Sequence, residues 1–496
     1  MTDDPSTSRP VTKVLVLYTG GTIGMVPADE SNPASPLRPA PKDRLIKFVP
    51  LRLKGRAADI IWDIEGLTDE NGEPVGPLDS SKVGPKHWKL MATAIGAAYE
   101  KYDGFVILHG TDTMAYTASA LSFLLQNLGK PVIITGSQLP IFQPRTDAVM
   151  NFINALNIAG YRADGLMPLV PEVAICFGTV LLRGNRTTKV STSRWQGFDT
   201  PNYPHLGQIG ERIVIDKTVL RQVPAGSFTA NPRMKESVAT IPLYPGMAAK
   251  VLGNMLKLDV DGFILRTFGA GNAPDDSDFL NTLKEAIDAG KIVVNTTQCL
   301  EGTVEQGHYE ASSGLQNVGV ITGLDLTPEA ALTKLMWLLE EDPAEAALQM
   351  QINQRGEQSG SSYDVPYGEV GKGGTFVDIG KLAQRPARDL KTDSLERAVL
   401  RISALEMEDA KTGEPVSIAI FVNLNGANAD TPTSVPQFAG YLSGTYEGPK
   451  KTTLVRDITP TLKRVNEEGR TIYINLVPPA GKRFRAHGAY LTLFTD

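Results

Sequence analysis

The fold is decided by residues 14–24, which read VLVLYTGGTIG. The first part, residues 14–18, is a continuous apolar run, and such runs are typical of strands buried on both faces of a sheet. The second part, residues 19–24, places glycines directly after the strand, where they let the chain turn sharply at its carboxyl end. Ligands of α/β proteins bind at this edge of a parallel sheet. We therefore expect an α/β domain with a site near Thr22.

Three further apolar runs of strand length follow, and segments with helical spacing lie between them. The runs cover residues 105–108, 132–135 and 173–177, and the helical segments cover residues 86–99, 114–128 and 148–159. Alternation of strand and helix implies right-handed crossovers between parallel strands. The sequence thus predicts an α/β N-terminal domain with a Rossmann-like parallel sheet.

The rest of the chain shows two other patterns. A smaller α/β pattern has strands at 260–265 and 292–295 and helices at 276–289 and 328–339. Past a glycine-rich and serine-rich stretch, apolar residues alternate with period two, which predicts an antiparallel β-sandwich. The expected divisions are a disordered N-terminus (1–10), an N-terminal catalytic domain (11–205), a connection (206–240), a C-terminal α/β domain (241–355), a linker (356–390) and a β-sandwich accessory domain (391–496).

Composition limits the classes of partner. The chain has 496 residues, 42% hydrophobic and 21% charged, which is ordinary for a globular protein of roughly three domains. A formal net charge of −6 argues against nucleic acid as a partner. Membrane association is not expected either, because no apolar run approaches the ~20 residues of a span. The two cysteines, Cys176 and Cys299, suit a reducing compartment, and residues 1–10 lack signal-peptide features, so we expect a cytoplasmic protein.

Three segments carry side chains suited to catalysis. Thr22 lies in the turn after the first strand, where a threonine becomes a nucleophile only beside a base, and the alternative is a simple tight turn. His109-Gly-Thr-Asp-Thr113 follows the second strand. There we expect Thr113 to cap the next helix, His109 to be structural, and Thr111 and Asp112 to face the cleft.

The third segment, Arg183-Gly-Asn-Arg-Thr-Thr-Lys189, brings three cations after the strand at 173–177. Lys189 could act as a base in a Ser-Lys-like arrangement, and the alternative is a solvated basic loop. The five histidines lack the spacing of metal ligands, and the fingerprints of dinucleotide and phosphate loops are absent. We expect neither a metal nor a cofactor.

Taken together, these segments resemble the bacterial-type asparaginase family, and in particular its cytoplasmic type I branch. The resemblance covers about residues 11–356 and rests on motifs at 18–25, 79–81, 104–123, 129–138, 183–189, 269–274, 295–299 and 323–330. It implies hydrolysis of L-asparagine to L-aspartate and ammonia through an acyl-enzyme, with no cofactor. Thr22 looks like the nucleophile, and Thr111, Asp112 and Lys189 look like the catalytic triad.

The same resemblance assigns substrate contacts. Ser80, with Ser81 beside it, matches the position that holds the substrate α-carboxylate, and Asp112 matches the partner of the α-ammonium. Asn272 and Tyr309 also match substrate-binding segments. The family places a tyrosine in the loop after the nucleophile, whereas residues 25–50 contain none. Tyr309 could replace it, or could instead pack at an interface.

Regulation, assembly and alternatives also follow from the resemblance. Thr188, Arg266 and Cys299 match an effector site for asparagine, and a homodimer or homotetramer is expected. The alternatives are a glutaminase-asparaginase, a tRNA-linked amidotransferase subunit, a lysophospholipase-like enzyme, or a catalytically weak relative that acts as a binding protein.

The last domain lies outside that resemblance. Residues 418–424, 438–441 and 472–478 look like the β-domain that follows the copper domain in plant polyphenol oxidases. Copper chemistry is not implied, because His487 is the single histidine of this part of the chain and a copper site needs several imidazoles. A packing, shielding or docking module is the expected role.

Overall fold

The computed structural model describes residues 11–29, 31–32, 35–54, 59–163, 167–168, 170–305, 310–364, 380–384, 395–424, 426–448, 452–465, 472–486 and 488–495. The N-terminus predicted to be disordered, Tyr309, His487 and much of the predicted linker lie outside these ranges. The chain forms two compact units. The first comprises the described residues within Met1–Glu236, together with Leu326–Pro343 and Arg355–Glu357, and the second comprises the remainder.

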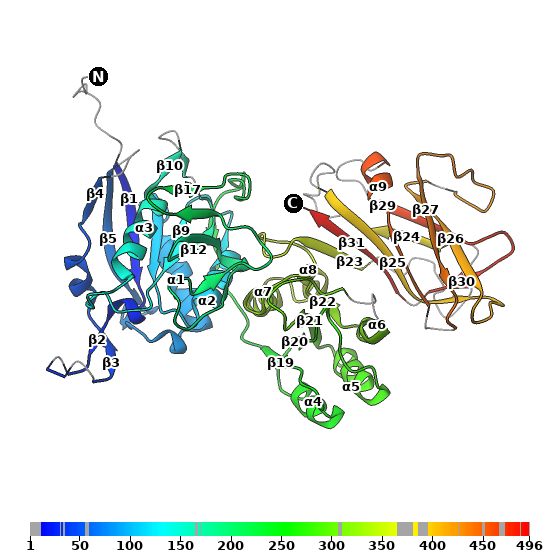
Figure 1. Cartoon of the computed structure of the whole chain (residues 1–496), viewed down its shortest axis with the longest axis horizontal. Coiled ribbons are helices and arrows are strands. Elements are labelled where there is room, and N and C mark those ends of the chain that lie inside the picture. The colour runs from blue at the N-terminus through cyan, green and yellow to red at the C-terminus, as the bar shows by residue number, and fades with distance from the viewer. Residues whose placement is uncertain are drawn as a thin grey trace, which may run out of the picture. The chain divides into compact units, whose positions relative to one another are not determined.

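The first unit is built on one mixed sheet (Figure 1, blue to green). Its parallel centre has the order β12-β9-β7-β1-β5, formed by Val173–Phe177, Val132–Thr135, Gly104–Leu108, Val11–Tyr18 and Asp59–Thr68. Antiparallel strands extend both edges: β13 (Val180–Arg183), β16 (Gly207–Ile209) and β17 (Ile213–Ile215) on one side, and β4 (Arg52–Lys54) on the other. The predicted parallel sheet is therefore confirmed at its centre and mixed at its edges.

Helices cover both faces of this sheet because its central strands are apolar on both sides. Helix α3 (Ala148–Gly160) packs on the face that presents Val14 and Val16. Helices α1 (Pro85–Ala98) and α2 (Met114–Leu124) pack against each other and cover the other face, toward which the buried Leu15 and Leu17 point.

Two helices differ from the sequence-based expectation. The helix predicted for residues 114–128 ends at Leu124, because Leu125–Gln126 form a short strand, β8, with β18 (Thr229–Ala230). The helix predicted for residues 328–339 exists as α7 (Pro328–Glu341), but it packs on α2 and belongs to the first unit. Local periodicity predicts a helix without revealing which core its apolar face joins.

The second unit begins with a smaller α/β layer. Its parallel sheet has the order β19-β20-β21-β22, formed by Val238–Pro242, Gly262–Thr267, Ile292–Thr297 and Ile321–Thr322. Its helices are α4 (Ala249–Leu256), α5 (Ser277–Asp288), α6 (Glu310–Asn317) and α8 (Ala346–Met350). Phe263 and Leu265 from the sheet pack with Phe279 and Leu283 from α5, which confirms the predicted α/β pattern.

The C-terminal part of the second unit is an antiparallel β-sandwich, as predicted (Figure 1, yellow to red). One sheet has the order β23-β31-β25-β28, formed by Gly360–Asp364, Gly488–Thr495, Leu395–Met407 and Thr452–Asp457, with β30 (Phe484–Arg485) beside β25. The other has the order β24-β29-β26-β27, formed by Gly380–Gln384, Ile472–Val477, Pro415–Val422 and Phe438–Thr445, and helix α9 (Thr459–Val465) follows β28.

The alternating residues of β26 explain the sandwich core. Ile418 and Ile420 point inward and pack with Leu400 of the facing sheet. Strands β23 and β24 fall within residues 356–390, a stretch whose glycine and serine content indicated a linker. Pairing with β31 and β29, which are distant in sequence, supplies the order that local composition did not reveal.

Candidate active site

Thr22 lies in a turn that only glycines allow. Gly20 and Gly21 have φ values of +118° and +82°. A Cβ atom on Gly21 would lie 2.2 Å from the backbone nitrogen of Gly110, and a Cβ on Gly20 would lie 2.1 Å from the carbonyl oxygen of Leu78. The two glycines therefore let the Thr22 turn touch two other backbone segments.

The sheet explains why the segments of Thr22 and Thr111 meet. Tyr18, the last residue of β1, is in register with Leu108, the last residue of the neighbouring parallel strand β7. The loops that follow the two strands therefore emerge side by side at the carboxyl edge, as the sequence predicts. Thr22 is half-buried and begins a short 3-10 helix, Thr22–Gly24.

Ser80 joins this site through a third segment. The Gly21 nitrogen donates to the Leu78 carbonyl at 2.9 Å, which fixes the segment leading to Ser80. Ser80 is buried, and its Oγ accepts a hydrogen bond from the Asp112 backbone nitrogen at 3.3 Å. A Cβ on Gly110 would lie 2.4 Å from this Oγ, so Gly110 is also needed for the close approach.

Two neighbours hold Ser80 in place, and one of them corrects a prediction. Thr113 occupies the N-cap position of α2, but its hydroxyl makes no capping bond. The hydroxyl instead donates to the Ser80 carbonyl at 2.8 Å, because that carbonyl lies within reach only in the folded chain. On the other side, Asp79 Oδ1 accepts from the backbone nitrogen of the exposed Ser81 at 2.9 Å, and this bond lowers the pKa of the Asp79 carboxyl.

Lys189 contacts Thr111 and Asp112, the two residues that the family resemblance groups with it. Its Nζ donates to Thr111 Oγ1 at 2.9 Å and to Asp112 Oδ1 at 2.6 Å. The Lys189 side chain is 19% exposed and that of Asp112 is 65% exposed, so the carboxylate has free surface for a further cation. An amine at hydrogen-bond distance from a threonine hydroxyl has the geometry that proton transfer between the two groups requires.

The segment that carries Lys189 differs from the prediction in two respects. It follows the antiparallel strand β13 and a short 3-10 helix, Gly184–Arg186, instead of following β12 directly. The alternative of a solvated basic loop is wrong for this segment, because Arg183 and Arg186 are buried. Arg183 pairs with the buried Glu172 at 2.7 Å, which compensates the charge.

His109 is a structural residue, as predicted. Burial lowers the pKa of its imidazole to about 4, so the ring is neutral near pH 7. Its Nδ1 lies 2.6 Å from the Gly110 carbonyl and therefore carries the proton. Its Nε2 accepts from the Thr117 hydroxyl at 2.9 Å, and Trp88 Nε1 donates to the same hydroxyl. The chain of bonds fixes the Gly110 backbone that forms one wall of the site.

The structure adds a residue that the sequence did not single out. Tyr18 is buried at the end of β1, and its hydroxyl donates to the Ala40 carbonyl at 3.0 Å, while the Ala40 nitrogen donates to the Gly24 carbonyl at 2.8 Å. Burial raises the pKa of the Tyr18 phenol, so the hydroxyl stays protonated. It thereby fastens the hairpin of β2 (Met25–Pro27) and β3 (Leu37–Pro39) to the nucleophile turn.

The other predicted site residues lie as follows. Thr188 forms strand β14 with Lys189, and its hydroxyl donates to Glu329 Oε1 of α7 at 2.8 Å. Arg266, Asn272 and Cys299 belong to the second unit: Arg266 lies on β20, Asn272 is bridged to Phe268, and the exposed Cys299 follows β21.

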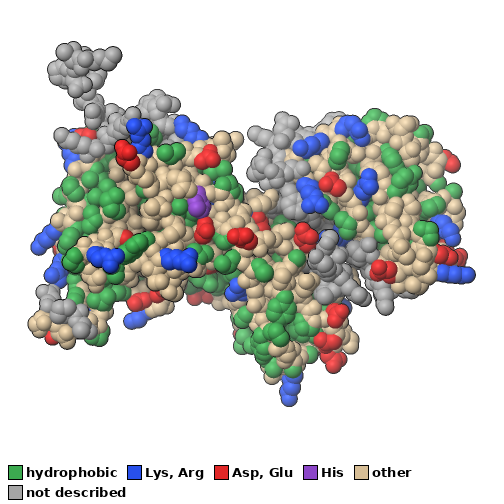
Figure 2. Space-filling model, viewed as in Figure 1, with side chains coloured by type: hydrophobic (Ala, Val, Ile, Leu, Met, Phe, Trp, Pro, Cys, Tyr) green, Lys and Arg blue, Asp and Glu red, His purple; other side chains and the backbone are tan. Residues whose placement is uncertain are grey.

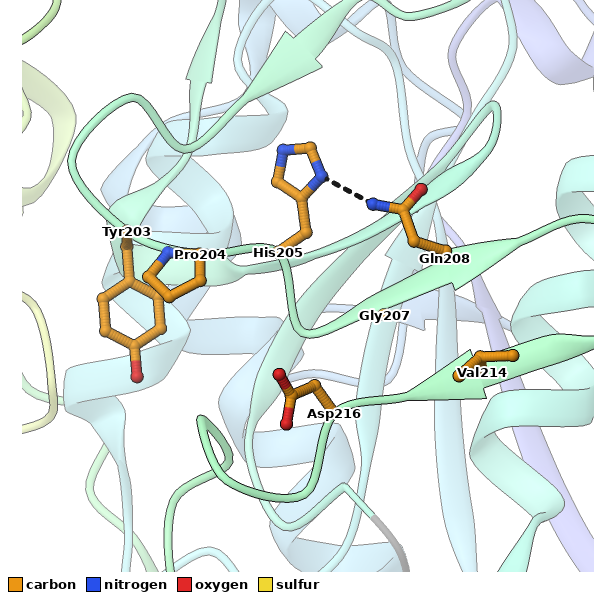
Figure 3. Close-up of a pocket in the computed structure, with 7 residues that line it drawn as sticks. All are labelled: Tyr203, Pro204, His205, Gly207, Gln208, Val214 and Asp216. Carbon is orange, nitrogen blue, oxygen red and sulfur yellow. Dashed lines mark hydrogen bonds between the residues drawn. The ribbon is translucent and has the colours of Figure 1, made fainter.

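A cavity of about 450 Å³ lies elsewhere in the first unit (Figure 3). Its described lining comes from residues 203–216 and does not include the threonines, Asp112 or Lys189. Gln208 Nε2 donates to His205 Nδ1 at 3.1 Å across its rim, and Asp199 accepts from His205 Nε2 at 2.8 Å. Because Tyr203, His205 and Asp216 are already hydrogen-bonded to neighbouring residues, this cavity is a weaker candidate than the Thr22 edge.

Comparisons with known proteins identify the family. The model of the asparaginase N-terminal domain matches residues 13–221, and that of the glutaminase/asparaginase C-terminal domain matches residues 237–351. The chain belongs to the asparaginase family. Its asparaginase part is 41% identical to L-asparaginase 1 of Escherichia coli (strain K12) over 347 residues, which is 69% of this chain and 97% of that protein.

Two further relatives extend the comparison. The crystal structure of L-asparaginase I from Vibrio cholerae has a TM-score of 0.59 and 40% sequence identity, and covers 70% of this chain and 99% of that one. The 60 kDa lysophospholipase of Homo sapiens is 36% identical over 343 residues, which is 66% of this chain and 58% of the human protein. The matched family domains of this chain end at residue 351, before the first strand of the β-sandwich at Gly360.

Three features bear on the expected partners: membrane-spanning helices, groups of metal ligands and the distribution of surface charge. None of the helices in the described ranges combines the length and the apolarity that a membrane span requires. Within the same ranges no group of three or more His, Cys, Asp or Glu is arranged to hold a metal ion. On the face drawn in Figure 2, lysine and arginine side chains lie among aspartate and glutamate side chains in both units.

Proposed function

We propose that this member of the asparaginase family hydrolyses L-asparagine to L-aspartate and ammonia. The observation that carries the proposal is the pair of contacts from Lys189 Nζ, 2.9 Å to Thr111 and 2.6 Å to Asp112, beside the Thr22 turn. A base, a relay hydroxyl and a nucleophile at one sheet edge are what amide hydrolysis through an acyl-enzyme requires.

In the proposed reaction the Thr22 Oγ attacks the side-chain amide carbon. The new carbon–oxygen bond forms as the hydroxyl proton moves to the Thr111–Lys189 pair, and the carbon–nitrogen bond breaks when the departing nitrogen takes up a proton and leaves as ammonia. A water molecule then attacks the acyl ester, which frees Thr22 and releases L-aspartate. One water is consumed, and no redox step or cofactor takes part.

The substrate assignments rest on complementary charge. Ser80 and Ser81 would donate to the α-carboxylate, and the exposed side of Asp112 would pair with the α-ammonium. Asn272 and Tyr309 keep their assignment to substrate binding through the family resemblance. An α-amino acid zwitterion needs an anionic partner and several donors, which this set supplies.

Glutamine is the second candidate substrate, since one extra methylene changes discrimination by only about 1–3 kcal/mol. The human 60 kDa lysophospholipase keeps a lysophospholipase activity among the alternatives. A tRNA-linked amidotransferase subunit and a binding protein without turnover fit less well, because the net charge is −6 and the Lys189 contacts are intact.

Further assignments complete the proposal. The protein would work in the cytoplasm as a homodimer or homotetramer, with Thr188, Arg266 and Cys299 forming an effector site for asparagine. The C-terminal sandwich would be a packing, shielding or docking module like the β-domain of plant polyphenol oxidases, which it resembles in residues 418–424, 438–441 and 472–478.

The test is ammonia release by the purified full chain from L-asparagine and L-glutamine across substrate concentration. Thr22→Ala and Lys189→Ala should each lose at least about 100-fold in kcat, because they remove the nucleophile and the base. Lys284→Ala is the matched control, since its ion pair with Asp288 is exposed on α5. Sigmoidal kinetics that become hyperbolic in Arg266→Ala would support the effector site. Activity retained in Thr22→Ala would contradict the proposed reaction.

A further inference from the structure

A short segment just past the matched C-terminal domain packs into the first unit. The matched C-terminal domain ends at residue 351. Arg355–Glu357, called the anchor segment below, belongs to the first unit, although its neighbours in the chain on both sides belong to the second. The contacts that hold the anchor segment there are made to α7 and to the loop that carries Lys189.

One end of the anchor segment is held by a buried ion pair. Glu357 Oε1 lies 2.6 Å from Lys334 Nζ of α7, and both side chains are 0% exposed. The Arg355 backbone nitrogen donates to the other carboxylate oxygen of Glu357 at 2.5 Å. Removing two charges from water is costly, so the ion pair adds little net stability, but its directional bonds fix the segment in one place.

The anchor segment contacts the loop that carries Lys189, here called the base loop (residues 183–189). Asn185 Nδ2 donates to the Arg355 carbonyl at 3.0 Å, and Arg186 Nη1 donates to the Glu357 carbonyl at 2.9 Å. Between them Gly356 has φ +78° and lies so close to Arg183 that a Cβ atom would be 2.7 Å from Nη1. Each of the three residues of the anchor segment thus lies against a residue of the base loop.

Two further contacts hold the base loop. Arg183 is also fixed by Glu172, and the Thr187 hydroxyl donates to the Arg183 carbonyl at 2.6 Å. The loop is therefore rigid from Arg183 to the residue that precedes Thr188. We propose that the anchor segment is a positioning element for the reaction, which holds the base loop so that Lys189 Nζ meets Thr111 and Asp112. This inference rests on the role proposed for Lys189.

The experiment uses the full chain with Glu357→Gln and, separately, Gly356→Ala. In each variant kcat for L-asparagine should fall about tenfold or more, with KM within about threefold of the wild type, because small displacements of a catalytic group cost rate more than binding. The pH profile of kcat should also change shape, which a loss of global stability alone would not produce.

The matched control is Glu406→Gln, which breaks the pair of the buried Glu406 and the partly exposed Arg485 in the β-sandwich. It should lower the melting temperature and leave kcat and its pH profile unchanged. If Glu357→Gln fails to fold, Lys334→Gln/Glu357→Gln buries no unpaired charge and gives the same readouts. Folded anchor-segment variants with wild-type kcat and pH profile would overturn the proposal and leave a purely structural role.

A failure of the proposed function can be told apart from a failure of the positioning proposal. If Lys189→Ala keeps turnover, or the wild type has none, amide hydrogen exchange of residues 183–189 tests the positioning contact by itself. Faster exchange there in Glu357→Gln, but not in Glu406→Gln, supports the anchor segment as the element that orders the base loop. Unchanged exchange overturns it.

Discussion

The backbone of Gly21 rests directly on the backbone of Gly110. A Cβ atom on Gly21 would lie 2.2 Å from the Gly110 nitrogen and 2.3 Å from its Cα. The nucleophile turn and the segment of Thr111 are thus in backbone contact. His109 holds the Gly110 carbonyl, and the Gly21 nitrogen is held by the Leu78 carbonyl, so both sides are fixed.

Gly21→Ala should therefore inactivate the enzyme. Separating the two segments by about 1 Å is expected to cost about 100-fold or more in kcat. Gly72→Ala is the control, because Gly72 has the same φ of +82° but nothing within 4 Å of its added Cβ, so it carries the backbone strain without the displacement. Equal activity of the two variants in an ammonia-release assay would contradict the importance of the contact.

His109 should make stability depend on pH. Its folded pKa is about 4, below the ordinary value of 6.5, so between these values the unfolded chain binds one more proton than the folded chain. Stability from this group is complete above pH 6.5 and falls by up to about 1.4 kcal/mol per pH unit as the pH drops toward 4. Urea unfolding at pH 5, 6 and 7 should show that the free energy of unfolding depends less on pH in His109→Gln than in wild type. An equal pH dependence in the two proteins would contradict the prediction.

Thr113 should act on substrate binding through Ser80. Thr113→Val keeps the side-chain shape and removes the hydrogen bond to the Ser80 carbonyl, which is worth about 1 kcal/mol. KM for asparagine should rise about fivefold, whereas Thr113→Ser, which keeps the hydroxyl, should stay close to wild type. A melting temperature lowered in Thr113→Val with KM unchanged would instead indicate a helix cap.

Tyr18 should hold the hairpin after Thr22. Tyr18→Phe leaves the Ala40 carbonyl without its partner and should cost about 1–3 kcal/mol in local stability. Limited proteolysis should then cut residues 25–40 faster, and kcat should fall with it. The exposed Tyr473 supplies the control, Tyr473→Phe. Identical cleavage rates in the two variants would argue against the clamp.

The sequence predicts the parts of this molecule that depend on local pattern. Apolar runs give β9 and β12 at their observed bounds, and glycine after β1 indicates the site at the sheet edge. Features that depend on distant partners were missed. The pairing of Thr113 with Ser80, the packing of α7 on α2 and the burial of Glu357 join residues far apart in the chain, and no local periodicity encodes them.

The tyrosines near the nucleophile turn also show that contacts between distant residues cannot be predicted from local sequence. Its absence from residues 25–50 is visible in the sequence, but Tyr18 reads as an ordinary core residue of a buried strand. Only the folded chain brings the Tyr18 hydroxyl to the Ala40 carbonyl and the Tyr18 ring against Gly24. A Cβ atom on Gly24 would lie 2.1 Å from the Tyr18 hydroxyl oxygen.

In the proposed reaction Thr22 carries the acyl group of the acyl-enzyme. The most direct measurement is an acid quench of the enzyme during turnover of L-asparagine, followed by peptide mass mapping. We expect an aspartyl ester on the peptide that contains Thr22, absent from Thr22→Ala and from enzyme without substrate. An aspartyl group on any other residue, together with turnover by Thr22→Ala at the wild-type rate, would contradict it.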